Sequence, residues 1–437
     1  MNDGSREPLS PRSDSRAFRW RNYPLLLSSQ FLGAFGDNVI LAVILGPVMK
    51  RFQAHEITAQ DQQIQNIFYT SLLFLPYLIF APIAGYFNDR FPKTQGLMAG
   101  NALKMLGAVL AWFSLAHQEY LLGVGYLVVG FGACLYSPAK YGILPEILPT
   151  SRLVKANGTV ELLTLLAILC GNIFGAQIVD HLTLHICYGI VIVIYTVSTL
   201  LNLIMLPTPA HSEVQFASTV REFGQTVRFI FERRRLVKIV VGTSLFWICG
   251  AIMKMNFQPW GQQVMHFTTM TEVALLGLWL SIGVMIGSVL AGQLHKIGEL
   301  QRTRGYGLTL AVAVAFIACT TYLIRGGLTH PRAYVIALLI FAGIMAGLFL
   351  IPLNAALQAE SHQGKLGKTI ATQNMIENAA MLGGSAFAYF NVTIGFDPSQ
   401  IFLALAGLIA VISLFLGFQR KGTITPEPAI SEAASAG

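Results

Sequence analysis

Residues 29–38 read S-Q-F-L-G-A-F-G-D-N and place a carboxylate, Asp37, near the middle of a long apolar segment over about residues 23–52. About 20 mostly apolar residues are enough to cross a bilayer, so this segment is long enough to be a membrane helix. A carboxylate at the centre of such a helix costs about 2.5–3.5 kcal/mol on insertion scales and is by default a candidate functional site. Gln30 lies seven residues earlier on nearly the same face, and Asn38 flanks the acid. The stretch therefore predicts a membrane helix that carries a polar site.

The composition of the whole chain agrees with this prediction. Of the 437 residues, 54% are hydrophobic and only 11% are charged, whereas a soluble domain has about 25% charged residues. A soluble enzyme of this composition would expose far too much apolar surface. The net charge of +8 is attributed to loops of a membrane protein, and no nucleic-acid partner is expected. The five cysteines fall within apolar segments without paired extracellular spacing, which predicts free thiols.

Hydropathy divides the chain into twelve apolar segments. They run over about residues 23–52, 65–88, 94–117, 121–144, 156–180, 183–206, 237–266, 271–296, 303–325, 332–357, 368–394 and 398–420. The predicted fold is an all-α membrane protein with twelve transmembrane helices in two six-helix halves. The five expected parts are a tail, a first half, a linker, a second half and a second tail, over residues 1–22, 23–206, 207–236, 237–420 and 421–437.

The linker combines apolar residues at helical spacing with a cluster of arginines. The apolar positions are Val220, Phe223, Val227, Ile230 and Phe231. This pattern predicts an amphipathic helix on the cytoplasmic surface, with its basic face toward anionic lipid. A simple connection between the two halves is the alternative, and both can hold.

Lysine and arginine are distributed unequally between the two sides of the predicted bundle. Four of the 29 lie in the loops of one side, and two, Lys104 and Lys254, lie within apolar segments. All the others lie in the tails and in the loops of the opposite side. Because cytoplasmic loops carry the excess of basic residues, both termini are expected in the cytoplasm.

The two halves also resemble each other in sequence. Pro138 to Glu146 mirrors Pro352 to Glu360 at an offset of 214 residues, and Ser28 mirrors Ser244 at an offset of 216. Parallel six-helix repeats are typical of the major facilitator architecture, in which the substrate site lies at the repeat interface near the midplane.

Polar residues inside the apolar segments form a candidate substrate site. An offset of 216 superimposes Asn38 on Lys254, so that Asp37 and Lys254 lie at nearly equivalent depths. A zwitterion would suit this set, with its phosphate or carboxylate on Lys254 and its amine on Asp37 or Glu377. Structural neutralisation of these charges is the alternative. The predicted substrate-binding residues are Gln30, Asp37, Asn38, Lys254, Gln373, Asn374 and Glu377.

Two further motifs predict a gate. Residues 85–93 resemble the major facilitator loop signature, in which Asp89 could face a helix N-terminus and Arg90 a nearby carboxylate, although Pro92 stands where glycine is usual. The second motif covers residues 136–161. Its candidate gating residues are Lys140, Glu146, Lys155 and Glu161, with a structural loop network as the alternative.

Several runs together resemble the lysophospholipid transporter family of the major facilitator superfamily. The resemblance extends over nearly all twelve segments, and the Tyr-Ser-Pro-Ala-Lys-Tyr-Gly run is its most specific part. The runs are Ser29–Asn38, Tyr136–Leu144, Leu153–Gly158, Val241–Trp247, Ile351–Ala355 and Gln373–Asn378.

This resemblance implies a bacterial inner-membrane flippase that moves lysophosphatidylethanolamine and related lysolipids to the inner leaflet. There an acyltransferase–acyl carrier protein synthetase, expected as a separate protein, would reacylate them. The family's headgroup-clamping positions map to Asp37, Asn38, Lys254 and Glu377. The family often has arginine at the position of Lys254, and lysine keeps the charge but loses bidentate phosphate contact.

Two other functions are compatible with the same features. The same scaffold and an intramembrane acid would serve an ion-coupled exporter of amphipathic drugs, and a basic central helix would also serve a non-transporting scaffold or sensor. No Walker loop, metal-ligand cluster or nucleophile elbow occurs in the sequence, so neither catalysis nor a metal or cofactor is expected. The protein is expected to act as a monomer.

Overall fold

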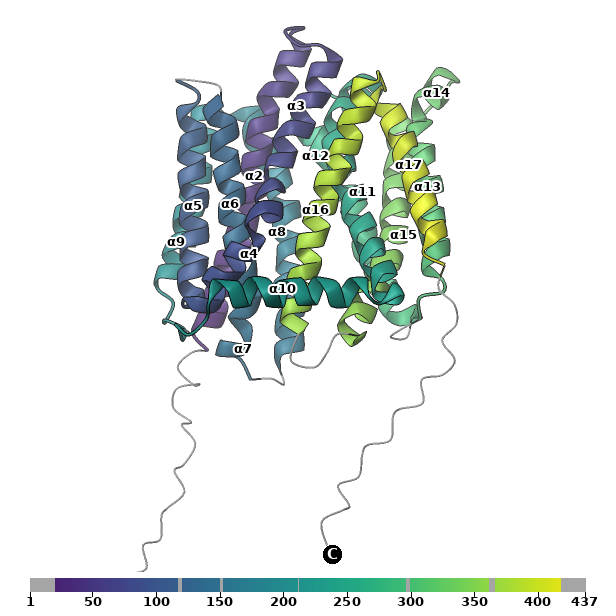
Figure 1. Cartoon of the computed structure of the whole chain (residues 1–437). Coiled ribbons are helices and arrows are strands. Elements are labelled where there is room, and N and C mark those ends of the chain that lie inside the picture. Colours follow the sequence, from purple (N-terminus) through teal and green to yellow (C-terminus); the bar gives the residue numbers. More distant parts are fainter. Residues whose placement is uncertain are drawn as a thin grey trace, which may run out of the picture.

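The computed structural model describes residues 20–116, 120–149, 152–210, 212–295, 299–360 and 366–417, and their regular secondary structure is helical. Most helices run along one common axis, whereas α10 crosses them at the end of the bundle where α2 begins and α17 ends (Figure 1). The helices are α2 (Asn22–Gln53), α3 (Ala59–Leu72), α4 (Leu75–Arg90), α5 (Lys93–Phe113), α6 (Tyr120–Gly142), α7 (Leu144–Ile147), α8 (Leu153–His181), α9 (Leu184–Leu203), α10 (Phe216–Phe231), α11 (Arg234–Met265), α12 (Met270–Leu294), α13 (Thr303–Ala318), α14 (Thr320–Arg325), α15 (Pro331–Glu360), α16 (Leu366–Thr393) and α17 (Pro398–Phe415).

Each of the twelve expected segments coincides with one helix or with a consecutive pair. Among the described residues, ten helical spans are long and apolar enough to cross a membrane, with α3 and α4 counted together. The remaining two segments are α13, which is shorter, and α16, which is more polar. The chain is therefore a multi-pass membrane protein.

The second expected segment begins earlier than predicted and is interrupted. Helix α3 begins at Ala59 because Thr58 and Asp61 form a reciprocal capping box, which satisfies two free backbone N–H groups. The break between α3 and α4 is followed by Pro76 in the first turn of α4. The hydropathy pattern did not predict the first turns of α3 because they are polar.

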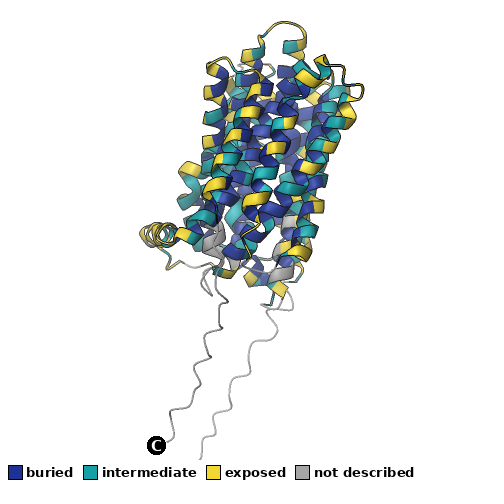
Figure 2. Ribbon diagram, turned by 90° about the vertical axis from the view of Figure 1, so that its right-hand side faces the viewer, coloured by how far each residue is buried: buried dark blue, intermediate teal, exposed yellow. Residues whose placement is uncertain are grey.

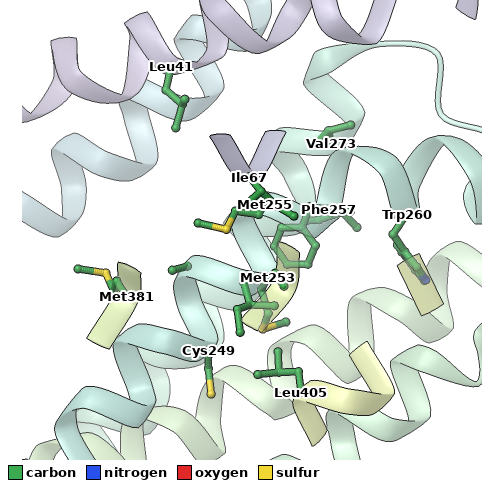
Figure 3. Packing of buried hydrophobic residues seen from close by; sticks show 14 of the residues in the cluster. Leu41, Ile67, Cys249, Met253, Met255, Phe257, Trp260, Val273, Met381 and Leu405 are labelled. Atoms are coloured by element: carbon green, nitrogen blue, oxygen red, sulfur yellow. The ribbon is translucent and has the colours of Figure 1, made fainter. Parts of the chain in front are cut away.

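Apolar side chains fill the bundle and also cover its outside. One buried cluster extends across both halves, and in it Ile67 of α3 joins Met255 and Phe257 of α11 (Figure 3). Exposed residues occur all along the outer helix faces (Figure 2), and among them are large apolar side chains such as Val193 (60% exposed) and Val411 (66% exposed). Such an exterior is compatible with lipid rather than with water.

Glycines allow two helix pairs to approach each other closely. In α5 and α6, a Cβ atom at Gly107 would lie 2.5 Å from the carbonyl oxygen of Gly125. In α12 and α15, a Cβ atom at Gly287 would overlap the carbonyl oxygen of Ile344. Without a hydrophobic drive between helices in lipid, such small-residue contacts supply much of the packing energy.

The two halves are joined at the end of the bundle opposite α10. Gln258 of α11 donates to the carbonyl oxygen of Leu45 in α2 over 3.2 Å. The carboxylate of Asp180, at the end of α8, accepts from the backbone N–H groups of Met270 and Thr271, both over 2.8 Å. Asp180 therefore caps the N-terminus of α12, where a negative charge is favoured.

The cysteine prediction is confirmed. Cys134, Cys170, Cys187, Cys249 and Cys319 are all free thiols.

Candidate transport site

Asp37 is neutralised within the first half. Its Oδ2 atom lies 2.7 Å from Nζ of Lys104 in α5, and its Oδ1 atom accepts a hydrogen bond of 2.9 Å from the hydroxyl group of Tyr195 in α9. The side chains of Lys104 and Asp37 are 3% and 13% exposed. The sequence had suggested Lys254 as the counterpart of Asp37, but the ion pair in this structure is with Lys104.

A glycine and an aromatic ring bound the space that Lys104 occupies. A Cβ atom at Gly132 would lie 2.7 Å from Cγ of Lys104, too close for an ordinary contact. The ammonium group also lies 5.3 Å from the ring centroid of Tyr136, a favourable cation–π arrangement. Tyr136 belongs to the Tyr-Ser-Pro-Ala-Lys-Tyr-Gly run, so this run helps to enclose the buried lysine.

Asn38 and Lys254 join the two halves at their interface. Lys254 Nζ donates to Asn38 Oδ1 over 2.8 Å. These are the two positions that the 216-residue offset superimposes, which means that equivalent points of the two repeats meet here. Across the described residues, Lys254 forms no ion pair, and its hydrogen-bond acceptor is a neutral amide. The interface of the two halves therefore holds a lysine whose hydrogen-bond acceptor, within the described residues, is uncharged.

Helix α16 contributes a second polar cluster. Gln373 Nε2 donates to Glu377 Oε1 over 2.7 Å and to Asn354 Oδ1 of α15 over 3.0 Å. Gln373 and Glu377 are 8% and 4% exposed. The two residues are four apart on the helix, a spacing that makes their side chains neighbours, and the contact holds a buried carboxylate in one orientation.

Gln30 lies between α2 and α8. Its Nε2 atom donates to the carbonyl oxygen of Val160 over 3.2 Å and to the hydroxyl group of Thr164. In this state Gln30 fastens two helices of the first half, while its role toward substrate stays a prediction.

A cavity of about 430 Å³ lies between the two halves near α10. Its walls come mainly from α4, α6, α10 and α16, with Lys93 of α5 and Pro145 of α7. Two of the predicted site residues, Asp89 and Asn374, line it, together with Lys93, Tyr141 and Thr226. The Asn38–Lys254 pair is not part of this lining, so the predicted residues are divided between the cavity and the interface.

The predicted gating residues have several different surroundings. Arg90 donates to the hydroxyl group of Tyr86 over 2.7 Å and to the carbonyl oxygen of Val214 over 3.5 Å, and it forms no ion pair in the described part of the chain. Glu146 lies 3.6 Å from Lys93 at the ends of α7 and α5. These contacts fasten α4 to the segment before α10, and α7 to α5.

The other gating candidates lie close by in the chain. The ammonium group of Lys140 lies 4.9 Å from the ring centroid of Tyr141. Lys155 and Glu161 belong to α8, but their side chains lie outside the described residues. Their role in a gate stays a prediction.

Sequence reasoning missed three residues that hold this site together. Tyr195 carries no pattern that distinguishes it from other aromatic residues of the spans. Asn354 lies two residues after Pro352, as Lys140 lies two residues after Pro138, so the repeat could have indicated it. Asp180 resembles any acid at a helix end, and only the packing of α8 against α12 explains it.

Comparison with known proteins identifies the family of the chain. Residues 26–385 match the Major Facilitator Superfamily. The lysophospholipid transporter LplT of Enterobacter sp. (strain 638) is 33% identical over 359 residues, which cover 81% of this chain and 85% of that protein. The lysophospholipid transporter LplT of Klebsiella pneumoniae (strain 342) is 30% identical over 404 residues, which cover 91% and 96%.

Solved structures agree in fold at low sequence identity. The D-xylose–proton symporter has a TM-score of 0.68 at 14% identity, with 92% of this chain and 97% of that chain covered. The POT family transporter PepTSo has a TM-score of 0.69 at 12% identity, with 91% of this chain and 97% of that chain covered. The chain belongs to the Major Facilitator Superfamily and, within it, to the lysophospholipid transporter family.

Proposed function

We propose that this protein is a flippase that moves lysophospholipids, including lysophosphatidylethanolamine, to the inner leaflet of the bacterial inner membrane by alternating access. The observation that carries the proposal is the Lys254 ammonium group, which lies at the interface of the two halves and, within the described part of the chain, donates its hydrogen bond to the neutral Asn38 amide. The activity named for the relatives supports the choice of lysophospholipid as substrate. Transport of this kind makes and breaks no covalent bond.

The proposed headgroup contacts follow from the charges at the interface. The phosphate binds Lys254 beside Asn38. The ammonium group binds Glu377, which accepts from Gln373, a residue that also donates to Asn354, while Asn374 faces the adjoining cavity. Asp37 enters these contacts when Lys104 releases its carboxylate. The acyl chain lies against apolar helix faces or projects between helices into lipid.

The proposed orientation places both termini and α10 in the cytoplasm, as the distribution of lysine and arginine favours. The end closed by Gln258 and Asp180 then faces outward, and the cavity near α10 faces inward. In this state the protein has closed its outer side. An acyltransferase–acyl carrier protein synthetase is the proposed consumer of the lysolipid delivered to the inner leaflet.

The test is uptake of labelled lysophosphatidylethanolamine by spheroplasts. The intact protein should transport it, and Lys254→Ala should lower uptake at least tenfold, because a charged hydrogen bond to phosphate contributes about 1.5–3 kcal/mol. Lys254→Arg should retain most of the activity. Lys238→Ala is a matched control on the same helix, because Lys238 lies near the α10 end of α11 and donates to the carbonyl oxygen of Gly417.

The same assay with Asp37→Ala measures how far that residue contributes to transport. No uptake by the correctly inserted intact protein would contradict the lysophospholipid assignment. Full uptake by both Asp37→Ala and Lys254→Ala would contradict the assignment of the site. It would not contradict the assignment of lysophospholipid as the substrate.

A further inference from the structure

Helix α10 lies beside the membrane-spanning helices rather than beneath them. It crosses in front of the bundle in Figure 1, and after a quarter turn of the view it is seen end-on outside the edge of the bundle (Figure 2). Its first residue, Phe216, packs edge-on against Tyr86 of α4 with 5.4 Å between ring centroids. Near its other end, Ile230 is fully buried. Both ends are therefore fastened to the bundle at one level along its axis.

One side of α10 faces the bundle. Thr219, Glu222, Phe223 and Thr226 line the cavity between α4, α6 and α16. At about 100° per residue these four positions and Ile230 share one side of the helix. The contacts of this side hold α10 against the bundle. The other sides of the helix do not face the bundle.

A second side of α10 carries exposed apolar residues. Phe216, Val220 and Phe231 are 46%, 39% and 60% exposed. They lie about a quarter turn clockwise from the cavity side when α10 is viewed from its first residue. In that view the bundle is on the left, because α10 runs from α4 toward α11 in front of it (Figure 1). The apolar stripe therefore points along the bundle axis, toward the apolar outer faces of the spans.

A third side of α10 is basic and points away from the bundle. Arg221 and Arg228 are exposed and lie opposite the cavity side. Arg228 pairs with Glu232, and its side chain is still 80% exposed. After Glu232, Arg233 and the first residue of α11, Arg234, add two exposed positive charges. The order around the helix is thus bundle, apolar stripe, then arginines.

We propose that α10 is an interfacial helix that binds the anionic surface of the adjoining bilayer leaflet. The stripe of Phe216, Val220 and Phe231 enters the boundary of the acyl chains, and Arg221 and Arg228 bind the phosphates of anionic phospholipids. An interfacial helix needs an apolar face toward the acyl chains and basic residues at headgroup level, and the spans hold α10 at that level. The inference concerns a lipid surface and does not depend on the transported substrate.

The depth of α10 can be measured in the full-length protein in nanodiscs. Single cysteines at Val220, Phe231 and Gln225, in a background with the five native cysteines replaced by alanine, carry a nitroxide label. Labels at Val220 and Phe231 should collide more with oxygen than with a water-soluble nickel chelate. The label at Gln225, on the side away from the stripe, should show the reverse. Equal nickel accessibility at all three positions, as for a helix in water or one awaiting a soluble partner, would overturn the proposal.

Lipid retention provides a second measurement on the protein with its native cysteines. After purification from membranes with phosphatidylglycerol, native mass spectrometry counts the bound lipid. Arg221→Gln with Arg228→Gln should lower retention about fivefold for each arginine, since each basic residue near an anionic surface contributes that factor. The matched variant with lysine at both positions should retain the lipid. Unchanged retention in the glutamine variant would contradict the role of the two arginines.

Discussion

Lys104 shows how one buried charge is accommodated inside a membrane helix bundle. Its ammonium group has Asp37 at 2.7 Å and the ring of Tyr136 at 5.3 Å. A cation and an anion that leave water together cost much less than either one alone, because each supplies the other's missing solvation. Gly132 leaves room that the lysine side chain needs. The expensive carboxylate of α2 is therefore one half of a pair.

The pair can be tested by removing one or both charges. Lys104→Met should destabilise the protein by about 3–5 kcal/mol, because it leaves the Asp37 carboxylate buried without its cation. The double variant Asp37→Asn with Lys104→Met should recover most of that loss, since no uncompensated charge remains. Melting of the detergent-solubilised protein measures both. A double variant no more stable than Lys104→Met alone would show that the pair is not the source of the loss.

At the scale of the element, helix α12 uses its glycines in two different ways. Gly287 faces α15, where a Cβ atom would overlap the carbonyl oxygen of Ile344. Gly277 and Gly292 lie on the same helix, and nothing lies within 4 Å of a Cβ atom built on either of them. The close approach of α12 to α15 therefore depends on particular glycines rather than on the glycine content of the helix.

This difference predicts opposite effects of the same substitution. Gly287→Ala should lower the melting temperature and the yield of folded protein, because the backbones must separate, at a cost of about 1–3 kcal/mol for overpacking. Gly277→Ala and Gly292→Ala should leave stability unchanged or raise it by up to about 1 kcal/mol, the helix propensity that alanine gains over glycine. Thermal unfolding of all three variants side by side checks the prediction. Equal losses in the three would contradict it.

At the scale of the whole molecule, contacts between the halves differ along the bundle axis. Far from α10 the halves are hydrogen-bonded directly, as between Gln258 and Leu45. Halfway along, Asn38 and Lys254 meet as equivalent positions of the two repeats. Toward α10 a cavity lies between the halves and is lined by residues of α4, α6 and α16. Alternating access requires the closed end to open, so the contacts far from α10 must break during transport.

A reversible cross-link tests this requirement. Cysteines at Leu45 and Gln258, joined by a short cross-linker with an internal disulfide, should abolish uptake of lysophosphatidylethanolamine, because the outer end can no longer open. Reduction should restore it. A cross-link between cysteines at Trp112 and His185 should leave uptake unaffected, since these two residues contact each other within the first half, with 3.1 Å between Nε1 and Nδ1. Uptake that persists through the first cross-link would exclude an opening at this end.

Much of the fold was readable in the sequence because its signals are local. Runs of apolar residues predict the spans, the cluster of arginines predicts the linker helix, and the mirrored motifs predict the repeat. The offset of 216 residues even identified Asn38 and Lys254 as equivalent, and the structure joins them. The contact between Gln373 and Glu377 was likewise predictable, since residues four apart on a helix are neighbours.

What only the tertiary structure decided is the choice of partners between helices. Residues 29–38 determined that a carboxylate lies within a membrane-spanning helix. They did not determine that it pairs with Lys104 and accepts a hydrogen bond from Tyr195. Nor did they indicate that Lys254 would remain without an ion pair among the described residues. The periodicity of a helix determines which side chains share a face, whereas packing determines which face of another helix lies opposite. That second choice depends on glycines that lie far apart in the chain, and it decides which of the two lysines, Lys104 or Lys254, forms the ion pair with Asp37.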